Sequence, residues 1–334
     1  MNQRRVGVLL GGWGEEREIS VKTGEAIATA LEKRGHQVTR VMAGPGLDQT
    51  LRGAGVDVAV LALHGRMGED GKVQGLLEVM GIPYSGSGVL ASALAMNKGY
   101  ARKLFRQHNL ATPAGYVVHR SQVEEVDELH CDLGFPCVVK PASGGSSVGL
   151  TLVHTQEQLK PAVAKACRYG GEALVERFVK GREITVAILD DEVLGSCEIS
   201  SPGATFDFST KYGKALGGDA VGDQPVAKYH LPPRISPTRL ANIETMALTA
   251  YRALGCSGAA RIDFICPDVG NEVILEVNTL PGMTPSSLLP KIAKAAGLSF
   301  EDLCDKLVES ASLEQTDVLE APVVNPSGPE RHAS

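Results

Sequence analysis

Long apolar runs and strongly basic stretches are both missing from this sequence of 334 residues. No run approaches the ~20 apolar residues of a membrane span, and the one near the N-terminus, residues 6–10, is too short for a secretory signal. The formal net charge is -6 and like charges do not gather in blocks, which argues against nucleic acid or an anionic membrane as a partner, because both favour basic surfaces. We therefore expect a soluble, cytoplasmic protein.

The seven cysteines show neither a metal-binding nor a disulfide pattern. Their number is odd, and neither a CxxC motif nor a zinc-like spacing occurs. We interpret them as reduced thiols that pack as small apolar groups.

Two common nucleotide-binding motifs are also absent. The N-terminal GGWGEE does not match GxGxxG, and the GxxxxGK[ST] pattern of a Walker A loop does not occur. A dinucleotide-binding oxidoreductase is excluded on this ground.

The first part of the chain does contain the alternation of strands and helices typical of α/β proteins. Residues 5–10, 37–42 and 56–63 are predicted strands, and helical spacing follows the first strand up to Gly35 and returns over residues 73–80. Such alternation predicts a parallel sheet with helices on its faces. At ~150 residues per domain, the whole chain is expected to form two or three domains.

After residue 90 the pattern changes to strands separated by short turns and a few long helices. We expect helices over residues 91–106, 156–168, 237–254 and 285–310, and strands over residues 137–140, 150–154, 172–176, 179–195 and 259–278. The last segment, 311–334, lacks periodicity, contains three prolines and is predicted to be disordered.

The segment VVKPASGGSSVG, residues 138–149, is predicted to be a hairpin with a glycine-rich tip. Glycine permits backbone angles that let successive N–H groups converge on an anion. Ser143, Ser146 and Ser147 add hydrogen-bond donors, and Lys140 adds a positive charge at the strand end. The alternative is a solvated tip without a ligand.

A second hairpin, RIDFICPDVGNEVILEVN at residues 261–278, carries acidic and amide side chains among apolar ones. Folding about its Pro-Asp-Val-Gly-Asn turn brings Asp263 opposite residues 275–276, and Glu276 and Asn278 share one face. Two carboxylates and an amide oxygen suit Mg²⁺. The alternative is a solvated polar face. Together with the first hairpin, this pattern indicates a Mg²⁺-nucleotide site suited to phosphoryl transfer.

These motifs belong to a series that resembles the D-alanine–D-alanine ligase family of the ATP-grasp superfamily over about residues 5–310. In the family's order they are VLLGGWGEEREIS, ALHGRMGEDGKVQG, KPASGGSSVG, the Glu176/Glu183 pair in VERFVKGREITVA, RID, and LEVNTLPGMTPSSL. The resemblance implies ATP-dependent ligation of two D-alanines through an acyl phosphate, for peptidoglycan precursor synthesis.

The resemblance also implies a fold and a division of the chain. The expected fold is α/β, with an N-terminal parallel-sheet (pre-ATP-grasp) domain followed by a two-domain ATP-grasp fold. The expected units are the N-terminal substrate-binding domain 1–95, the central subdomain with the glycine-rich flap 96–184, the C-terminal subdomain with the Mg²⁺ site and lid loop 185–310, and the tail 311–334. A homodimer is implied as well.

ATP-binding and metal-binding residues carry over position by position. Lysines would contact the phosphates beneath the flap serines, while glutamates and apolar residues would hold the adenosine. The expected ATP set is Lys98, Lys140, Ser146, Ser147, Glu176, Phe178, Val179, Glu183 and Lys211. The expected ligands of two Mg²⁺ ions, or of Mn²⁺ in their place, are Asp263, Glu276 and Asn278.

The resemblance also assigns residues to the two D-alanines and to catalysis. One carboxylate would hold the first ammonium, an arginine and a backbone N–H would stabilise the developing oxyanion, and a helix start would bind the second carboxylate. The substrate set is Glu16, His64, Glu69, Arg261, Gly282, Ser287 and Leu288, and the catalytic set is Glu16, Ser146, Tyr212, Arg261 and Gly282.

Two of these residues have plainer alternatives. Glu16 could simply favour a helix N-terminus, and His64 could be a buried, hydrogen-bonded histidine.

Other functions remain open at this point. A ligase that accepts D-lactate or D-serine would share the chemistry, although Tyr212 resembles the D-alanine-accepting form. The lid segment, residues 203–232, is longer and more glycine-rich than expected. Another ATP-grasp amino-acid ligase or carboxylase would not need the N-terminal motifs, and a non-enzymatic nucleotide-binding module would not need Arg261, Gly282 and Ser287.

Overall fold

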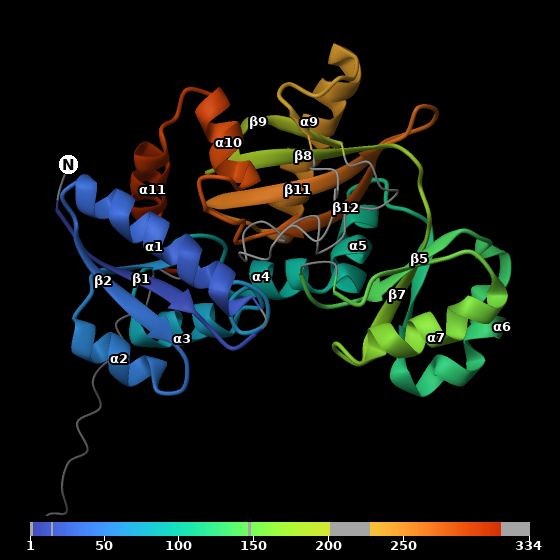
Figure 1. Cartoon of the computed structure of the whole chain (residues 1–334), viewed down its shortest axis with the longest axis horizontal. Coiled ribbons are helices and arrows are strands. Elements are labelled where there is room, and N and C mark those ends of the chain that lie inside the picture. The colour runs from blue at the N-terminus through green and yellow to red at the C-terminus, as the bar shows by residue number, and fades with distance from the viewer. Residues whose placement is uncertain (1–2, 15, 146–147, 201–227, 315–334) are drawn as a thin grey trace, which may run out of the picture.

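The part of the chain that the structure describes contains three β-sheets (Figure 1). The computed structural model describes residues 3–14, 16–145, 148–200 and 228–314. Among these residues, no helix combines the length and the apolar content that a bilayer crossing requires.

The N-terminal sheet is parallel, as the sequence predicts, with strand order β2-β1-β3. Its strands are β1 (Arg5–Gly11), β2 (Gln37–Ala43) and β3 (Val58–Leu61), and its helices are α1 (Arg17–Lys33), α2 (Leu47–Ala54) and α3 (Lys72–Met80). Both faces of β1 are apolar because α1 covers one face and α2 and α3 cover the other. The helix α1 approaches β1 closely at Gly24, where a Cβ atom would lie 2.4 Å from that of Leu10.

A four-stranded antiparallel sheet of order β4-β7-β5-β6 lies at the other end of the molecule (Figure 1). Its strands are β4 (Gly115–His119), β5 (Cys137–Pro141), β6 (Thr151–Val153) and β7 (Glu172–Arg177). The helices α6 (Val126–His130) and α7 (Gln156–Cys167) pack on one face, with short 3-10 turns at Arg120–Glu125 and Cys131–Leu133. β5 and β6 pair antiparallel, which confirms the predicted hairpin around the glycine-rich segment.

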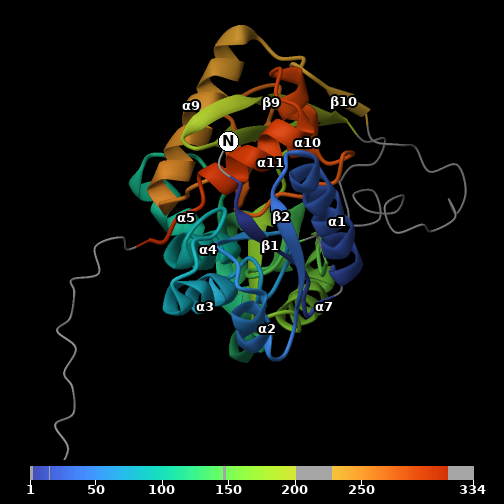
Figure 2. The same ribbon diagram turned by 90° about the vertical axis from the view of Figure 1, so that its left-hand side faces the viewer.

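The third sheet has five antiparallel strands in the order β10-β9-β8-β11-β12. They are β8 (Arg182–Leu189), β9 (Glu192–Ser200), β10 (Lys228–His230), β11 (Ala259–Cys266) and β12 (Val273–Asn278). α5 (Lys98–Gln107) and α9 (Pro237–Leu254) cover one face. α10 (Leu288–Ala295) and α11 (Phe300–Glu309) cover part of the other and share an apolar core with α1 and β1 (Figure 2).

Three predicted elements are interrupted in the structure. The helix expected over 91–106 is two helices, α4 (Val89–Met96) and α5, because Asn97 has extended backbone angles. The helix expected over 285–310 is likewise divided into α10 and α11, and the strand expected over 179–195 contains the whole of β8, a turn at residues 190–191 and the start of β9.

Two boundaries of the expected units separate residues that belong together in the structure. Residues 182–184 lie in β8 and therefore in the five-stranded sheet, although they were assigned to the central unit. At the C-terminal end, Ser312 forms an antiparallel bridge with Tyr84, so the prediction of disorder is wrong for residues 311–314. Residues 315–334 lie outside the described residues. The division into units stays a prediction.

Candidate active site

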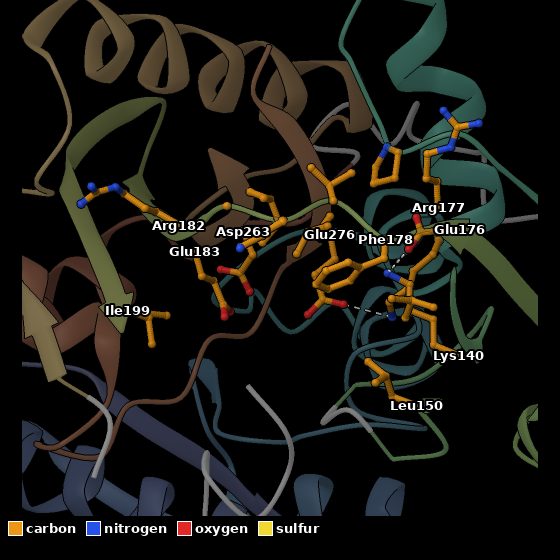
Figure 3. Close-up of a pocket in the computed structure, with 18 of the residues that line it drawn as sticks. Lys140, Leu150, Glu176, Arg177, Phe178, Arg182, Glu183, Ile199, Asp263 and Glu276 are labelled. Atoms are coloured by element: carbon orange, nitrogen blue, oxygen red, sulfur yellow. Dashed lines mark ion pairs between the residues drawn. The ribbon is translucent and has the colours of Figure 1, made fainter. Parts of the chain in front are cut away.

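Three adjoining cavities lie along the five-stranded sheet and extend toward both other sheets. The largest, of about 520 Å³, lies between the five-stranded and four-stranded sheets (Figure 3). A second, of about 100 Å³, shares Glu183 and Asp263 with it and extends toward α1 and α10. A third, of about 50 Å³, shares Lys98 and Glu276 with the first. The largest is big enough for a nucleotide, and the others are big enough for small polar groups.

The hairpin β11–β12 brings the predicted metal ligands together. Asp263 pairs directly with Glu276, and Arg261 pairs with Asn278, so these four side chains lie on one face of the sheet. The predicted proximity of Asp263 to Glu276 is thereby confirmed. The register shifts directly after Asp263, where a bulge separates it from Phe264.

Neighbouring groups hold the side chains of Asp263 and Asn278 in a fixed direction. Asp263 is 4% exposed and accepts a hydrogen bond of 2.6 Å from the hydroxyl of Thr185. The Arg261 guanidinium spans both carboxylate oxygens of Asp263, at 2.9 and 2.8 Å. The side-chain oxygen of Asn278 accepts from the backbone N–H of Leu280 at 3.0 Å.

The donor set fits Mg²⁺ rather than a transition metal. It contains two carboxylates and one amide oxygen, which are hard ligands, and Mg²⁺ completes its coordination with phosphate oxygens and water. No group of three or more histidines, cysteines, aspartates and glutamates that could hold an ion alone occurs within the described part of the chain. The metal role of Asp263, Glu276 and Asn278 stays a prediction.

Lys98 connects the metal hairpin to the glycine-rich flap. It is the first residue of α5, and its ammonium lies 3.2 Å from a carboxylate oxygen of Glu276. The same ammonium donates to the carbonyl of Gly144 at 2.6 Å, and the backbone N–H of Lys98 donates to Ala142. A buried positive charge therefore lies where the flap begins, beside the predicted metal site.

A buried ionic triad closes one end of the large cavity (Figure 3). The carboxylate of Glu176, on β7, lies 2.6 Å from the ammonium of Lys140 and also pairs with the guanidinium of Arg102. Burial lowers the pKa of Arg102, and the charge of Glu176 opposes this effect. Lys140, which was expected to contact phosphates, is directed toward Glu176 in the structure.

The wall beside this triad is apolar. Val138, Leu150, Phe178 and Val179 line the cavity here, as do Lys180 and Arg182 nearer its outer rim. Glu183 also lines this cavity, and the β8–β9–β11 register puts it on the same face as Asp263 and Ile199 (Figure 3). An apolar wall at one end and lysine and carboxylate groups at the other match a base and its phosphates.

The expected first-substrate residues meet at the N-terminal end of the flap. A Cβ atom on Gly145 would lie 3.8 Å from a carboxylate oxygen of Glu16 and 3.7 Å from one of Glu69. Glu69 accepts from the backbone N–H of Gly65 at 2.8 Å. The structure thus brings both carboxylates to one place.

The structure partly agrees with the simpler alternatives, namely that Glu16 begins a helix and that His64 is a buried, hydrogen-bonded histidine. Glu16 is the N-cap residue of α1, yet its side chain makes no capping hydrogen bond. The ring of His64 is buried, with one nitrogen 3.4 Å from the hydroxyl of Thr23 and the other 3.9 Å from Glu69. His64 therefore faces the site as a hydrogen-bonded, buried side chain.

The second cavity contains the residues expected around the second substrate. Arg261, Gly282, Ser287 and Leu288 all line it, and Ser287 is the N-cap residue of α10. A Cβ atom on Gly282 would lie 3.1 Å from the Ser287 hydroxyl, so a side chain there would crowd this cavity.

Four expected site residues cannot be placed. Ser146, Ser147, Lys211 and Tyr212 lie outside the described residues.

The sequence is similar to known protein families over most of its length. It matches the family model described as D-ala D-ala ligase C-terminus over residues 104–309 and the one described as D-ala D-ala ligase N-terminus over residues 45–87. The D-alanine–D-alanine ligase of Anaeromyxobacter dehalogenans is 46% identical over 310 residues, which cover 93% of this chain and 97% of the relative. The chain belongs to the D-alanine–D-alanine ligase family.

Solved structures of ligases share the fold. The D-alanine–D-alanine ligase of Bacillus anthracis matches with a TM-score of 0.81 and 36% identity, over 92% of this chain and 97% of that one. Its complex with ATP matches with a TM-score of 0.78 and 34% identity, over 93% and 97%. The VanG D-Ala:D-Ser ligase of Enterococcus faecalis matches with a TM-score of 0.79 and 28% identity, over 92% and 99%. The chain thus has the ATP-grasp fold of this ligase family.

Several residues of this ligase site were not predicted from the sequence. Lys22, Tyr229 and Thr284 line the second cavity. Arg102 belongs to the ionic triad at the end of the first cavity. The spacing of Arg102, four residues after Lys98 on the same face of a helix, was the available signal.

Proposed function

We propose that this protein joins two D-alanines to D-alanyl-D-alanine with consumption of ATP, as a step in peptidoglycan precursor synthesis. The observation that carries the proposal is the arrangement of the cavities in a member of this family. A nucleotide-sized cavity adjoins a smaller one along the face that holds Arg261 and Asp263. A phosphoryl donor and an acyl acceptor could therefore meet at this face.

The reaction needs an activated carboxylate. The carboxylate of the first D-alanine attacks the γ-phosphate, which gives an acyl phosphate and ADP, and the amine of the second D-alanine then displaces phosphate. Lys98 and Lys140 would neutralise the nucleotide phosphates, and Glu183 would accept from the ribose hydroxyls. Asp263, Glu276 and Asn278 would hold Mg²⁺, which when bound would neutralise charge on the transferred phosphate.

The acyl transfer develops negative charge on a carbonyl oxygen. Arg261 and the backbone N–H of Gly282 would stabilise this charge, since both line the second cavity. Ser287, at the start of α10, would bind the carboxylate of the second substrate, with Leu288 beside it. Glu16 would hold the ammonium of the first substrate, near His64 and Glu69.

A second candidate is ligation of D-alanine to a different acceptor. The similarity to the VanG D-Ala:D-Ser ligase, at 28% identity over 92% of this chain, favours D-serine as the acceptor to test. D-lactate is the further acceptor that we consider.

We propose that the protein acts in the cytoplasm as a homodimer. All seven cysteines are free thiols, which agrees with a reducing compartment. The dimer rests on the family resemblance and can be tested by sedimentation.

The first testable prediction concerns activity. Purified protein with ATP, Mg²⁺ and D-alanine should release phosphate and form a dipeptide of matching mass, whereas omission of D-alanine should abolish phosphate release. A panel of D-alanine, D-serine, D-lactate and L-alanine as acceptors then identifies the product. Folded protein that releases no phosphate with any acceptor would exclude the ligase assignment.

A further inference from the structure

The ionic triad of Arg102, Glu176 and Lys140 is built so that each oxygen of one carboxylate faces a different cation. Arg102 pairs with one oxygen of Glu176, and Lys140 lies 2.6 Å from the other. The three side chains are 6%, 3% and 11% exposed, respectively. Two cations therefore flank one buried carboxylate, and the ionised form of a carboxylate can only accept hydrogen bonds.

Arg102 fixes the direction of that carboxylate, and Lys140 is less suited to do so. The guanidinium of Arg102 is planar and is held at two points, because its second terminal nitrogen donates to the carbonyl of Pro113. Arg102 lies on the buried face of α5, one turn after Lys98. Lys140 has a flexible stem and a single ammonium, and it would also be needed by the nucleotide.

Glu176 lines the apolar end of the cavity, which is the end suited to a nucleobase. Glu176 and Pro113 line it together with Val138, Leu150 and Phe178. A planar base in this apolar end would present its edge to an acceptor that cannot donate. A 6-amino group offers a proton to such an acceptor, whereas a 6-oxo group offers only lone pairs.

We propose that Arg102 is a positioning residue for nucleobase selectivity. By pairing with Glu176, it fixes the position of this carboxylate in the lining of the cavity, so that the site favours a 6-aminopurine triphosphate over a 6-oxopurine triphosphate. This inference rests on the proposed ligase function, since selectivity is measured through that reaction. Arg102 itself lies behind Glu176 and acts through it.

The test compares ATP with inosine triphosphate, which carries a 6-oxo group in place of the 6-amino group. The ratio of kcat/KM for ATP to that for inosine triphosphate is measured for the wild type, Arg102→Lys and Arg102→Met. We expect this ratio to fall by about tenfold or more in both variants, the size expected when a hydrogen bond to a charged acceptor no longer separates the two bases. The KM for D-alanine should stay unchanged, because none of the triad residues lines the second cavity, which contains the residues expected around the second substrate.

Arg106→Met is the matched control. Arg106 lies one turn further along α5 and is exposed, so its loss should leave the nucleotide ratio as in the wild type. Arg102→Lys keeps the buried charge and provides the measurement if Arg102→Met does not fold. Arg102 variants that lose activity equally with both nucleotides would overturn the inference and show a purely structural role. A wild type that forms no dipeptide would instead contradict the proposed function.

Discussion

At the scale of single residues, charged side chains of the candidate site are already paired with one another or with neighbouring polar groups. Asp263 is held by Thr185 and Arg261, so the direction of its carboxylate is fixed before any ligand arrives. Such preorganisation lowers the reorganisation that binding would require. The same arrangement places a carboxylate that would bind a cation directly beside an arginine that would stabilise an anion.

A second prediction follows for the predicted metal ligands. Asp263→Asn keeps the shape of the side chain but removes its charge, so kcat should fall by at least roughly 100-fold and more Mg²⁺ should be needed for half-maximal rate. Steady-state kinetics over a Mg²⁺ titration measure both effects.

The matched control for this change is Asp268→Asn, in the exposed turn of the same hairpin. It should leave the kinetics unchanged. Near-normal turnover of the folded Asp263→Asn variant would show that this residue is not a metal ligand.

At the scale of elements, the break between α4 and α5 determines where Lys98 lies. Asn97 ends the first helix and caps the second, since its side-chain oxygen accepts from the backbone N–H of Tyr100 at 3.1 Å. Lys98 is therefore the first residue of a helix instead of lying within one. Its backbone N–H remains available for Ala142, and its ammonium reaches the flap and β12.

A third prediction concerns this cap. Asn97→Ala should lower the free energy of unfolding by about 1 kcal/mol, the typical value of an N-cap, and should also raise the KM for ATP because Lys98 loses its fixed position. Asn97→Asp retains the capping oxygen and should largely restore both values. Urea unfolding and nucleotide kinetics provide the measurements.

Ser236→Ala serves as the control for capping without a role in the site. Ser236 caps α9 by accepting from Arg239, so its loss should lower stability by a similar amount. An equal rise in KM for ATP in both capping variants would show that the effect is not specific to Lys98.

At the scale of the whole molecule, α11 docks onto the N-terminal sheet through a buried carboxylate. One oxygen of Asp305 lies 2.6 Å from Arg34 and the other 3.0 Å from His36, and the side chains of Asp305 and His36 are almost fully buried. Apolar contacts among α1, α10 and α11 surround this group (Figure 2). The contact joins the N-terminal sheet to α11, which shares an apolar core with residues of the five-stranded sheet.

A fourth prediction tests this docking. Asp305→Ala should destabilise the protein by about 3 kcal/mol, because it leaves Arg34 and His36 without their buried partner. Lys33→Ala, which removes the exposed pair with Glu301 on the same two helices, should cost less than about 1 kcal/mol. Thermal and urea unfolding compare the two, and equal losses would contradict a special role for Asp305.

The sequence alone determined what depends on local spacing. The alternation of side chains along strands and the Pro-Asp-Val-Gly-Asn turn were enough to place Asp263 opposite residues 275–276. The alternation of strands and helices predicted the parallel sheet. The ordered motifs were enough to indicate the ligase family. Local spacing did not reveal the helix break at Asn97, because the apolar pattern continues across it.

Only the tertiary structure decided which buried charges pair. Arg102 and Glu176 are 74 residues apart, and Arg34 and Asp305 are 271 apart, so neither pair shares an element. Periodicity tells which face of a helix or strand is buried, but a salt bridge between elements depends on how those elements dock, to within about an ångström. For this reason only the fold shows the triad of Arg102, Glu176 and Lys140. The sequence by itself already predicted the β11–β12 hairpin.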